Sequence, residues 1–283
     1  MTSDSAKGRT FLVTGANSGI GRALAERLAA EGGRVVLAAR SPERTVPVLD
    51  GIRASHPGID VQFLQIDLSD FGAVRRAAGQ FLDSGHPLDV LVNNAGVGGT
   101  FGINAEGFDL TYATNHLGPF LLTNLLLPRL RESPAARIVN VSSVAHYRVK
   151  RINWSVLDRH AAPVKSGFTA YATTKMMNVL HAKELARRLT GTSVTTSALH
   201  PGAVATNIWR SLPRPVKWVI KGFMLSSEEG ARTPFYCATS PDLRDVSGRY
   251  YDRCREVRPN PVADDVELAR ELWRRTEAAV ESK

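Results

Sequence analysis

The sequence has few cysteines and no long apolar run. Its 283 residues include only two cysteines, Cys237 and Cys254, which cannot build a disulfide framework and lack the spacing of a metal site. We therefore expect reduced thiols, a cytoplasmic location and no bound metal. Nowhere do about eighteen apolar residues follow one another, so we expect no membrane-spanning helix. Residues 1–9 are polar and lack the apolar core of a signal peptide.

The sequence also lacks a recognisable nucleic-acid-binding motif, although it is basic. Its formal net charge is +9. Such a balance suits nucleic acid, an anionic membrane surface, an anionic small molecule, or a basic surface without a specific partner. Zinc-finger, RRM and KH patterns are missing, so we expect no nucleic-acid partner.

What the sequence does contain is an alternation of short apolar runs with segments of helical periodicity. This order predicts right-handed βαβ units and a Rossmann-type α/β fold, a doubly wound parallel sheet of about seven strands with helices on both faces. We expect one domain over residues 1–283. The predicted strands are 9–14, 34–39, 61–66, 88–93, 137–142, 194–199 and a short edge strand at 248–251. The predicted helices are 20–31, 71–82, 106–130, 170–189 and a C-terminal helix at 263–280.

Two long loops interrupt this alternation, a basic insertion at 146–168 and a segment at 203–227. Long loops in a compact domain are commonly substrate loops or lids. We expect 203–227 to be a lid in which Trp209 and Trp218 cover an apolar substrate, while its cations face water or make peripheral contact with an anionic membrane. A helix packed on the core explains Trp218 equally well. Ser226–Glu229 has the pattern of a capping box that begins the next helix.

A glycine-rich loop lies where the first predicted strand turns into the first predicted helix. It reads Thr14-Gly15-Ala16-Asn17-Ser18-Gly19-Ile20-Gly21. Glycines at this turn let the backbone approach a pyrophosphate, and the free N–H groups of the helix start attract an anion. The strand, loop and helix together predict a dinucleotide site.

Tyr171 and Lys175 are four residues apart on a predicted helix and therefore share one face of it. A free tyrosine has a pKa of about 10. An ammonium about 4 Å away, at an effective dielectric of about 20, is worth roughly 4 kcal/mol. We therefore expect a phenol pKa of about 7, at which the hydroxyl can give and take protons.

The combination of these motifs resembles the short-chain dehydrogenase/reductase family over residues 8–250. Asn93-Asn94-Ala95-Gly96 resembles the family's NNAG segment beside the cofactor. Ile138-Val139-Asn140-Val141-Ser142-Ser143 resembles the strand that ends in the catalytic serine, with Ser143 facing the substrate. Tyr171–Lys175 matches the family's Y-x-x-x-K, Asn115 its proton-relay asparagine, and His200–Thr206 its PG segment near the nicotinamide.

The resemblance implies a catalytic set of Ser143, Tyr171, Lys175 and Asn115. It also implies a nicotinamide cofactor. The cofactor-binding residues that it implies are Gly15, Asn17, Ser18, Gly19, Ile20, Gly21, Asp67, Leu68, Asn94, Ala95, Gly96, Tyr171, Lys175, Val204 and Thr206.

The end of the second strand decides which nicotinamide cofactor we expect. An NAD site places a carboxylate there for the ribose hydroxyls, and an NADP site places a cation for the 2′-phosphate. The sequence reads Leu37-Ala38-Ala39-Arg40-Ser41, with no acid. Because the Arg40 guanidinium can fork onto a phosphate, we predict NADP(H).

The implied reaction is hydride transfer between nicotinamide and a small-molecule alcohol or carbonyl compound. Within the family, residues 115–118, 141–146 and 184–189 resemble retinol-dehydrogenase-like members, which act on apolar alcohols and aldehydes. A carbonyl reductase or ketoreductase of a biosynthetic pathway, with a polar or polyketide substrate, would share every catalytic residue. A non-catalytic NADP-binding sensor would be expected to have lost Tyr171 or Lys175. Members of the family commonly form homo-oligomers through their two long helices, although apolar residues there equally suit the core.

Overall fold

In the computed structural model, each predicted strand has a counterpart in one mostly parallel sheet. The structure describes residues 6–160, 166–202 and 225–281. Within them one eight-stranded sheet has the order β3-β2-β1-β4-β5-β6-β7-β8, and all neighbours are parallel except β7 and β8. The strands are β1 (Thr10–Thr14), β2 (Arg34–Ala39), β3 (Val61–Gln65), β4 (Val90–Asn93), β5 (Ala136–Val141), β6 (Val194–His200), β7 (Arg249–Asp252) and β8 (Arg255–Glu256).

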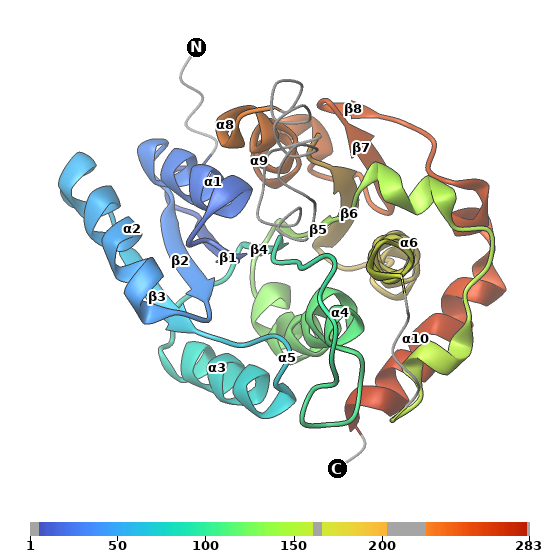
Figure 1. Ribbon diagram of the computed structural model, residues 1–283. Coiled ribbons are helices and arrows are strands. Elements are labelled where there is room, and N and C mark those ends of the chain that lie inside the picture. The colour runs from blue at the N-terminus through green and yellow to red at the C-terminus, as the bar shows by residue number, and fades with distance from the viewer. Residues whose placement is uncertain (1–5, 161–165, 203–224, 282–283) are drawn as a thin grey trace.

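The helices cover both faces of this sheet, as Figure 1 shows. Helices α1, α2, α8 and α9 lie on one side, and α3, α4, α5, α6 and α10 on the other. Their bounds are α1 (Gly19–Ala30), α2 (Pro42–Ser55), α3 (Phe71–Asp83), α4 (Leu110–Tyr112), α5 (Gly118–Arg131), α6 (Gly167–Arg188), α8 (Ser227–Gly230), α9 (Arg232–Thr239) and α10 (Val266–Glu281). The predicted doubly wound α/β fold is therefore confirmed, with one strand more than expected.

Side-chain alternation along the buried strands divides the core in two. In β1, Phe11 and Val13 join the cluster under α1, α2 and α9, whereas Leu12 joins the cluster under α3, α5 and α6. Successive side chains of a strand point to opposite faces, so a strand buried on both faces is apolar throughout. This burial fixes the register of β1 between β2 and β4 and with it the place of the loop that follows.

The C-terminal helix α10 packs against α5 and α6. The Trp273 ring lies 4.8 Å from that of Phe120 and is stacked on His181 at 5.5 Å, measured between centroids. The apolar residues of α5 and α6 at this contact therefore belong to the core of one chain.

The structure differs from the predicted elements in α2 and β8, and the helix expected over 106–130 begins only at Leu110 and contains the π-helical turn Ala113–Leu117. Helix α2 begins at Pro42 directly after β2, where no helix was expected. Strand β8 pairs antiparallel with β7 through the register Asp252 with Arg255. The capping box of Ser226 and Glu229 is present as predicted. Most of the expected lid at 203–227, including Trp209 and Trp218, lies outside the described residues.

None of the helices among the described residues is long and apolar enough to cross a bilayer. Within the same residues, no three His, Cys, Asp or Glu side chains are grouped so that they could hold a metal ion.

Candidate active site at the carboxyl ends of the strands

A cavity of about 850 Å³ opens at the carboxyl ends of β1 to β6. Its lining includes Thr14 from the end of β1, Arg40 from the end of β2, Asn94 after β4 and Val141 at the end of β5. The strand order reverses between β1 and β4, and ligands of open α/β sheets bind at such a point. The volume lies within the roughly 300–1,000 Å³ typical of cofactor and ligand sites.

The glycines of the loop after β1 let its backbone form part of the cavity wall. Gly15 has φ +70° and donates its N–H to the Ala38 carbonyl at 2.7 Å. A Cβ on Gly21 would lie 2.4 Å from the Gly15 oxygen and 2.5 Å from Asn94 Nδ2. Any larger residue at Gly21 would therefore push α1 away from the loop.

The start of α1 is open toward the cavity. Ser18 is the N-cap of α1, but its side chain makes no capping hydrogen bond, and no acid lies in the first turn. The N–H groups at a helix start need partners and favour an anion. A dinucleotide pyrophosphate fits this end of the cavity.

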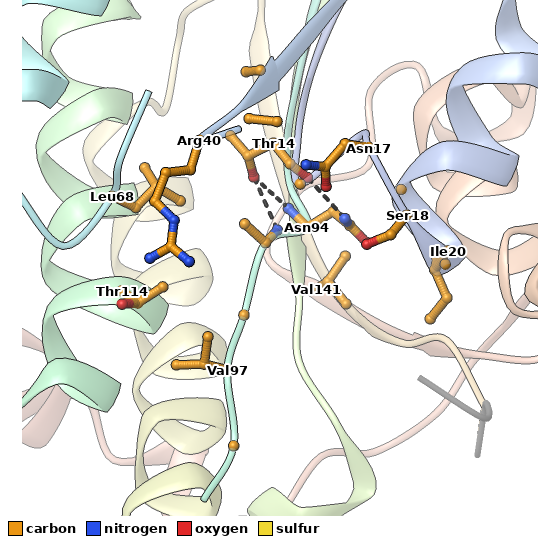
Figure 2. Close-up of a pocket in the computed structure, with 18 of the residues that line it drawn as sticks. Thr14, Asn17, Ser18, Ile20, Arg40, Leu68, Asn94, Val97, Thr114 and Val141 are labelled. Atoms are coloured by element: carbon orange, nitrogen blue, oxygen red, sulfur yellow. Dashed lines mark hydrogen bonds between the residues drawn. The ribbon is translucent and has the colours of Figure 1, made fainter. Parts of the chain in front are cut away.

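Hydrogen bonds between Thr14, at the end of β1, and Asn94, after β4, hold the loop in place (Figure 2). Asn94 Nδ2 donates to the Thr14 carbonyl at 2.8 Å. The Thr14 hydroxyl accepts the N–H groups of Asn94 at 2.9 Å and Ala95 at 3.0 Å, and donates to the Val92 carbonyl at 3.2 Å. The side chains of Thr14 and Asn94 thus pair the backbone N–H and C=O groups where both strands end. This structural role does not depend on a bound ligand.

Two arginines and the start of α2 lie at the end of β2. Arg40 lies across the cavity from Asn17 and Ser18 in Figure 2, and its side chain is 78% exposed. Its Nη1 lies 3.6 Å from the Asp67 carboxylate, a weak and exposed pair. Arg44 from α2 lines the same region. Ser41 caps α2 by accepting the Arg44 N–H at 3.3 Å. Two arginines therefore line this end of the cavity, and guanidinium groups are favoured partners of phosphates.

Tyr171 lies at the other end of the cavity and is 91% buried on α6. Burial raises the pKa of Tyr171, and a hydrogen bond with the Ser143 side chain opposes that rise. Lys175 Nζ lies 5.4 Å from the centroid of the Tyr171 ring. The predicted phenol pKa of about 7 is therefore wrong for this structure, because desolvation outweighs the other influences on the phenol.

Lys175 is buried between α6 and β5. Its Nζ donates to the Val141 carbonyl at 3.0 Å, and the Ser142 hydroxyl donates to the Lys175 carbonyl at 2.7 Å. Burial lowers the pKa of Lys175 to about 8. A Cβ on Gly96 would lie 3.3 Å from Nζ, so the loop after β4 passes directly over the ammonium.

Ser143 and Asn115 reach the same place from two other elements. Ser143 ends the β5 segment and caps the 3-10 turn Val144–Arg148, with its hydroxyl accepting the Ala145 N–H at 3.2 Å. Ser142 is turned to Lys175, as the alternation along β5 predicts. Asn115 lies in the π-helical turn Ala113–Leu117 between α4 and α5.

The Asn115 side chain connects the loop after β4 to α6. Its Oδ1 accepts the Val97 N–H and its Nδ2 donates to the Val97 carbonyl, both at 2.8 Å. Nδ2 also donates to the Thr174 hydroxyl at 3.1 Å. π-Helical turns are often found at functional sites.

The structure thus brings the expected site residues to one cavity or its edge. Ser143 lies beside Tyr171 and Asn115 is hydrogen-bonded to Val97, and both Tyr171 and Val97 line the cavity. Val204 and Thr206 lie outside the described residues. The other expected residues line it directly, namely Gly15, Asn17, Ser18, Gly19, Ile20, Gly21, Arg40, Asp67, Leu68, Asn94, Ala95, Gly96, Tyr171 and Lys175.

The expected site left out several polar residues of the lining, namely Thr14, Ser41, Arg44, Ser69, Thr100, Thr114, Ser142 and Ser227. Ser41-Pro42 is itself a helix-start signal, and it would have placed Arg44 in the first turn of α2.

Comparison with known proteins agrees with this geometry. Residues 9–156 match the short chain dehydrogenases. The chain is 42% identical over 277 residues to dehydrogenase/reductase SDR family member 13 of Bos taurus, which covers 95% of this chain and 72% of the relative. It is 41% identical over 293 residues to retinol dehydrogenase 14 of Mus musculus, covering 96% of this chain and 86% of the relative.

Solved structures share the architecture. An uncharacterized protein from Mycobacterium paratuberculosis superimposes with a TM-score of 0.79 at 32% identity, covering 98% of this chain and 95% of that one. A 3-oxoacyl (acyl-carrier-protein) reductase from Agrobacterium tumefaciens C58 with NADP bound has a TM-score of 0.70 at 27% identity, covering 88% and 94%.

Proposed function

Because the chain belongs to the short-chain dehydrogenase/reductase family, we propose that it is an NADP(H)-dependent oxidoreductase acting on apolar alcohols or carbonyl compounds. One observation carries the proposal. A single cavity joins an open helix start, two guanidiniums at the end of β2, and a buried tyrosine and lysine. A dinucleotide lying between them would reach from Arg40 to Tyr171.

The cations at the end of β2 support NADP(H) rather than NAD(H). Arg40 and Arg44 line the cavity where the adenosine ribose of a dinucleotide lies in this fold. Charge-assisted hydrogen bonds to a phosphate are worth roughly 1.5–3 kcal/mol each. Two acids lie near this place: Asp67, whose carboxylate is 3.6 Å from Arg40 Nη1, and Glu43, which accepts a hydrogen bond from the Ser41 hydroxyl at 2.7 Å.

The catalytic roles follow from the positions of the side chains. When bound, the nicotinamide ring supplies or accepts the hydride. The raised pKa of Tyr171 keeps its hydroxyl protonated at neutral pH, which is the form that donates a proton to a carbonyl oxygen in reduction. Ser143, whose side chain lowers the pKa of Tyr171, would donate to the same oxygen as negative charge develops on it.

Lys175 and Asn115 would hold this arrangement together. The buried Lys175 ammonium can bind ribose hydroxyls, and Asn115 joins α6 to the loop over Lys175. Both free thiols are consistent with the reducing cytoplasm that we propose as the location.

Exposed apolar side chains support an apolar substrate. Val144, directly after Ser143, is 47% exposed, and Phe168, one turn before Tyr171, is 52% exposed. Gly167 packs on Gly99, since a Cβ there would lie 2.6 Å from the Gly99 Cα. This contact brings the start of α6 to the loop that carries Phe101, which is 61% exposed.

A panel of aldehydes, ketones and alcohols, followed by nicotinamide absorbance, tests the proposal. We expect turnover of long-chain apolar aldehydes with NADPH and weak activity with NADH. Arg40→Ala should lower kcat/KM for NADPH about tenfold to hundredfold, the loss of one charged hydrogen bond, and leave NADH little changed.

Other outcomes of the panel would redirect the assignment. Turnover confined to polar or polyketide ketones would favour the biosynthetic carbonyl reductase. NADPH binding without turnover of any compound would favour the sensor. A strong preference for NADH would overturn the role given to Arg40.

A further inference from the structure

His146 is a buried histidine whose two ring nitrogens both have partners. The side chain is fully buried in the 3-10 turn that follows Ser143. Its Nδ1 lies 2.6 Å from the Ser143 carbonyl oxygen. Its Nε2 lies 3.1 Å from the backbone nitrogen of Asn260, far away in the sequence.

These partners determine the tautomer. A backbone N–H can only donate, so Nε2 must accept and carries no proton. A neutral imidazole has one N–H, which is therefore on Nδ1 and donates to the Ser143 carbonyl. Burial lowers the pKa of His146, so the neutral ring is the form present near pH 7.

Asn260 holds the turn as well as the ring. Its Nδ2 donates to the carbonyls of His146 at 3.0 Å and Val149 at 2.7 Å, and the side chain is 94% buried. The His146 ring is packed between Tyr147 and Tyr250, with centroids at 4.0 Å and 4.8 Å. The ring therefore has one available orientation.

We propose that His146 is a positioning residue for Ser143, an assignment that rests on the proposed function of this site. The Ser143 carbonyl receives two bonds from His146, one from Nδ1–H and one from the backbone N–H at 3.1 Å. The fixed carbonyl holds the Ser143 backbone, and with it the Cβ that carries the hydroxyl, beside Tyr171, whose pKa the Ser143 side chain lowers. Asn260, after β8, sets the tautomer that makes this possible.

Two substitutions of His146 distinguish a role in positioning Ser143 from a role in stabilising the fold. His146→Asn keeps a donor at the Nδ1 position and loses the acceptor for Asn260. His146→Gln keeps an acceptor near the Nε2 position and loses the donor to Ser143. His146→Asn leaves the buried Asn260 N–H without its acceptor, and His146→Gln removes one of the two hydrogen bonds to the Ser143 carbonyl, so both variants should unfold at a lower urea concentration than the wild type.

The kcat values of the two variants should differ. His146→Gln should lower kcat about tenfold to hundredfold at nearly unchanged KM for NADPH, whereas His146→Asn should retain most of kcat. Val149→Ala is a matched control, because it truncates a buried side chain of the same turn and leaves both bonds of His146 in place. It should lose stability without losing kcat.

A second readout does not depend on turnover. Nitrogen-15 NMR of the imidazole in the wild-type chain should show a protonated Nδ1 and an unprotonated Nε2 for His146. The opposite tautomer, or equal kcat for the Asn and Gln variants, would overturn the proposal. Absence of turnover in the wild type would contradict the proposed function but leave the tautomer test of the His146 hydrogen bonds standing.

Discussion

At the scale of single residues, Tyr171 and Lys175 show what spacing predicts and what it does not. Their four-residue separation placed both on one face of a helix, and the structure has them on α6 beside the same cavity. The pKa argument failed because it took account of the charge and left out burial. Both groups are more than 90% buried, and desolvation works against the charged form of each.

Burial of Lys175 should make the free energy of unfolding change with pH in the alkaline range. Its pKa is about 8 in the folded chain and 10.5 in the reference state. Between these values the unfolded chain binds more protons, so the free energy of unfolding rises with pH and the cost of burying the charge disappears. Below pH 8, Lys175→Met should be more stable than the wild type by up to roughly 3 kcal/mol.

Urea unfolding of both chains without cofactor, at pH 7, 8.5 and 10, measures this difference. The advantage of Lys175→Met should shrink steadily as the pH rises. A difference between the two chains that stays constant over this range would show that Lys175 is not buried as an ammonium.

At the scale of elements, the contact of α10 with α5 and α6 contains two buried histidines. His116 Nε2 lies 3.0 Å from the Thr276 hydroxyl of α10, and His181 stacks on Trp273. Burial lowers the pKa of His116 to about 4 and of His181 to about 3. Since free histidine titrates near 6.5, the unfolded chain takes up protons first as the pH falls, and stability decreases from about pH 6.5 downward.

His181→Phe keeps an aromatic ring against Trp273 and removes one titrating group. Between pH 7 and pH 5 it should lose about 2 kcal/mol less unfolding free energy than the wild type does. Chemical unfolding at both pH values checks this. Val149→Ala, which lies outside this contact and removes no titrating group, is the control and should keep the wild-type pH dependence. Equal acid sensitivity of His181→Phe and the wild type would contradict the assignment.

The elements that sequence patterns predicted are those with strong periodicity. Strands β1, β2, β4 and β5 are largely buried on both faces and therefore read as mostly apolar runs. Helix α2 was missed because Pro47 lies inside it and β-branched residues fill its start, although Thr45, Val48, Leu49 and Ile52 follow the helical period. Strand β8 has two exposed residues, and a segment so short carries no pattern.

Sequence motifs identified the residues that line the candidate site more completely than the residues that hold those side chains and loops in position. Glycines, Tyr171 and Lys175 are specified by local spacing, so their motifs are visible in the chain. The Thr14–Asn94 hydrogen bonds, Arg44 and the contact of Asn260 with His146 join residues far apart in sequence. Such contacts appear only once the sheet order and loop positions are known.

At the scale of the whole molecule, the fold places one cavity where the strand order reverses. The two core clusters fix the sheet between its helix layers, and the loops after β1, β2, β4 and β5 then meet at one edge. Arg40, in the proposed anion site, and Tyr171, the proposed proton donor, line the same cavity although they are 131 residues apart in the sequence. The account requires one bound dinucleotide to connect them.

Following a labelled atom tests that requirement most directly. With NADPH deuterated at both C4 positions and a long-chain aldehyde, the wild type should form an alcohol that carries one deuterium, detected by mass spectrometry. Tyr171→Phe should form it about 100-fold to 10,000-fold more slowly at nearly unchanged NADPH affinity, because only the proton donor is removed. An unlabelled alcohol from the wild type, or undiminished turnover by Tyr171→Phe, would contradict the account.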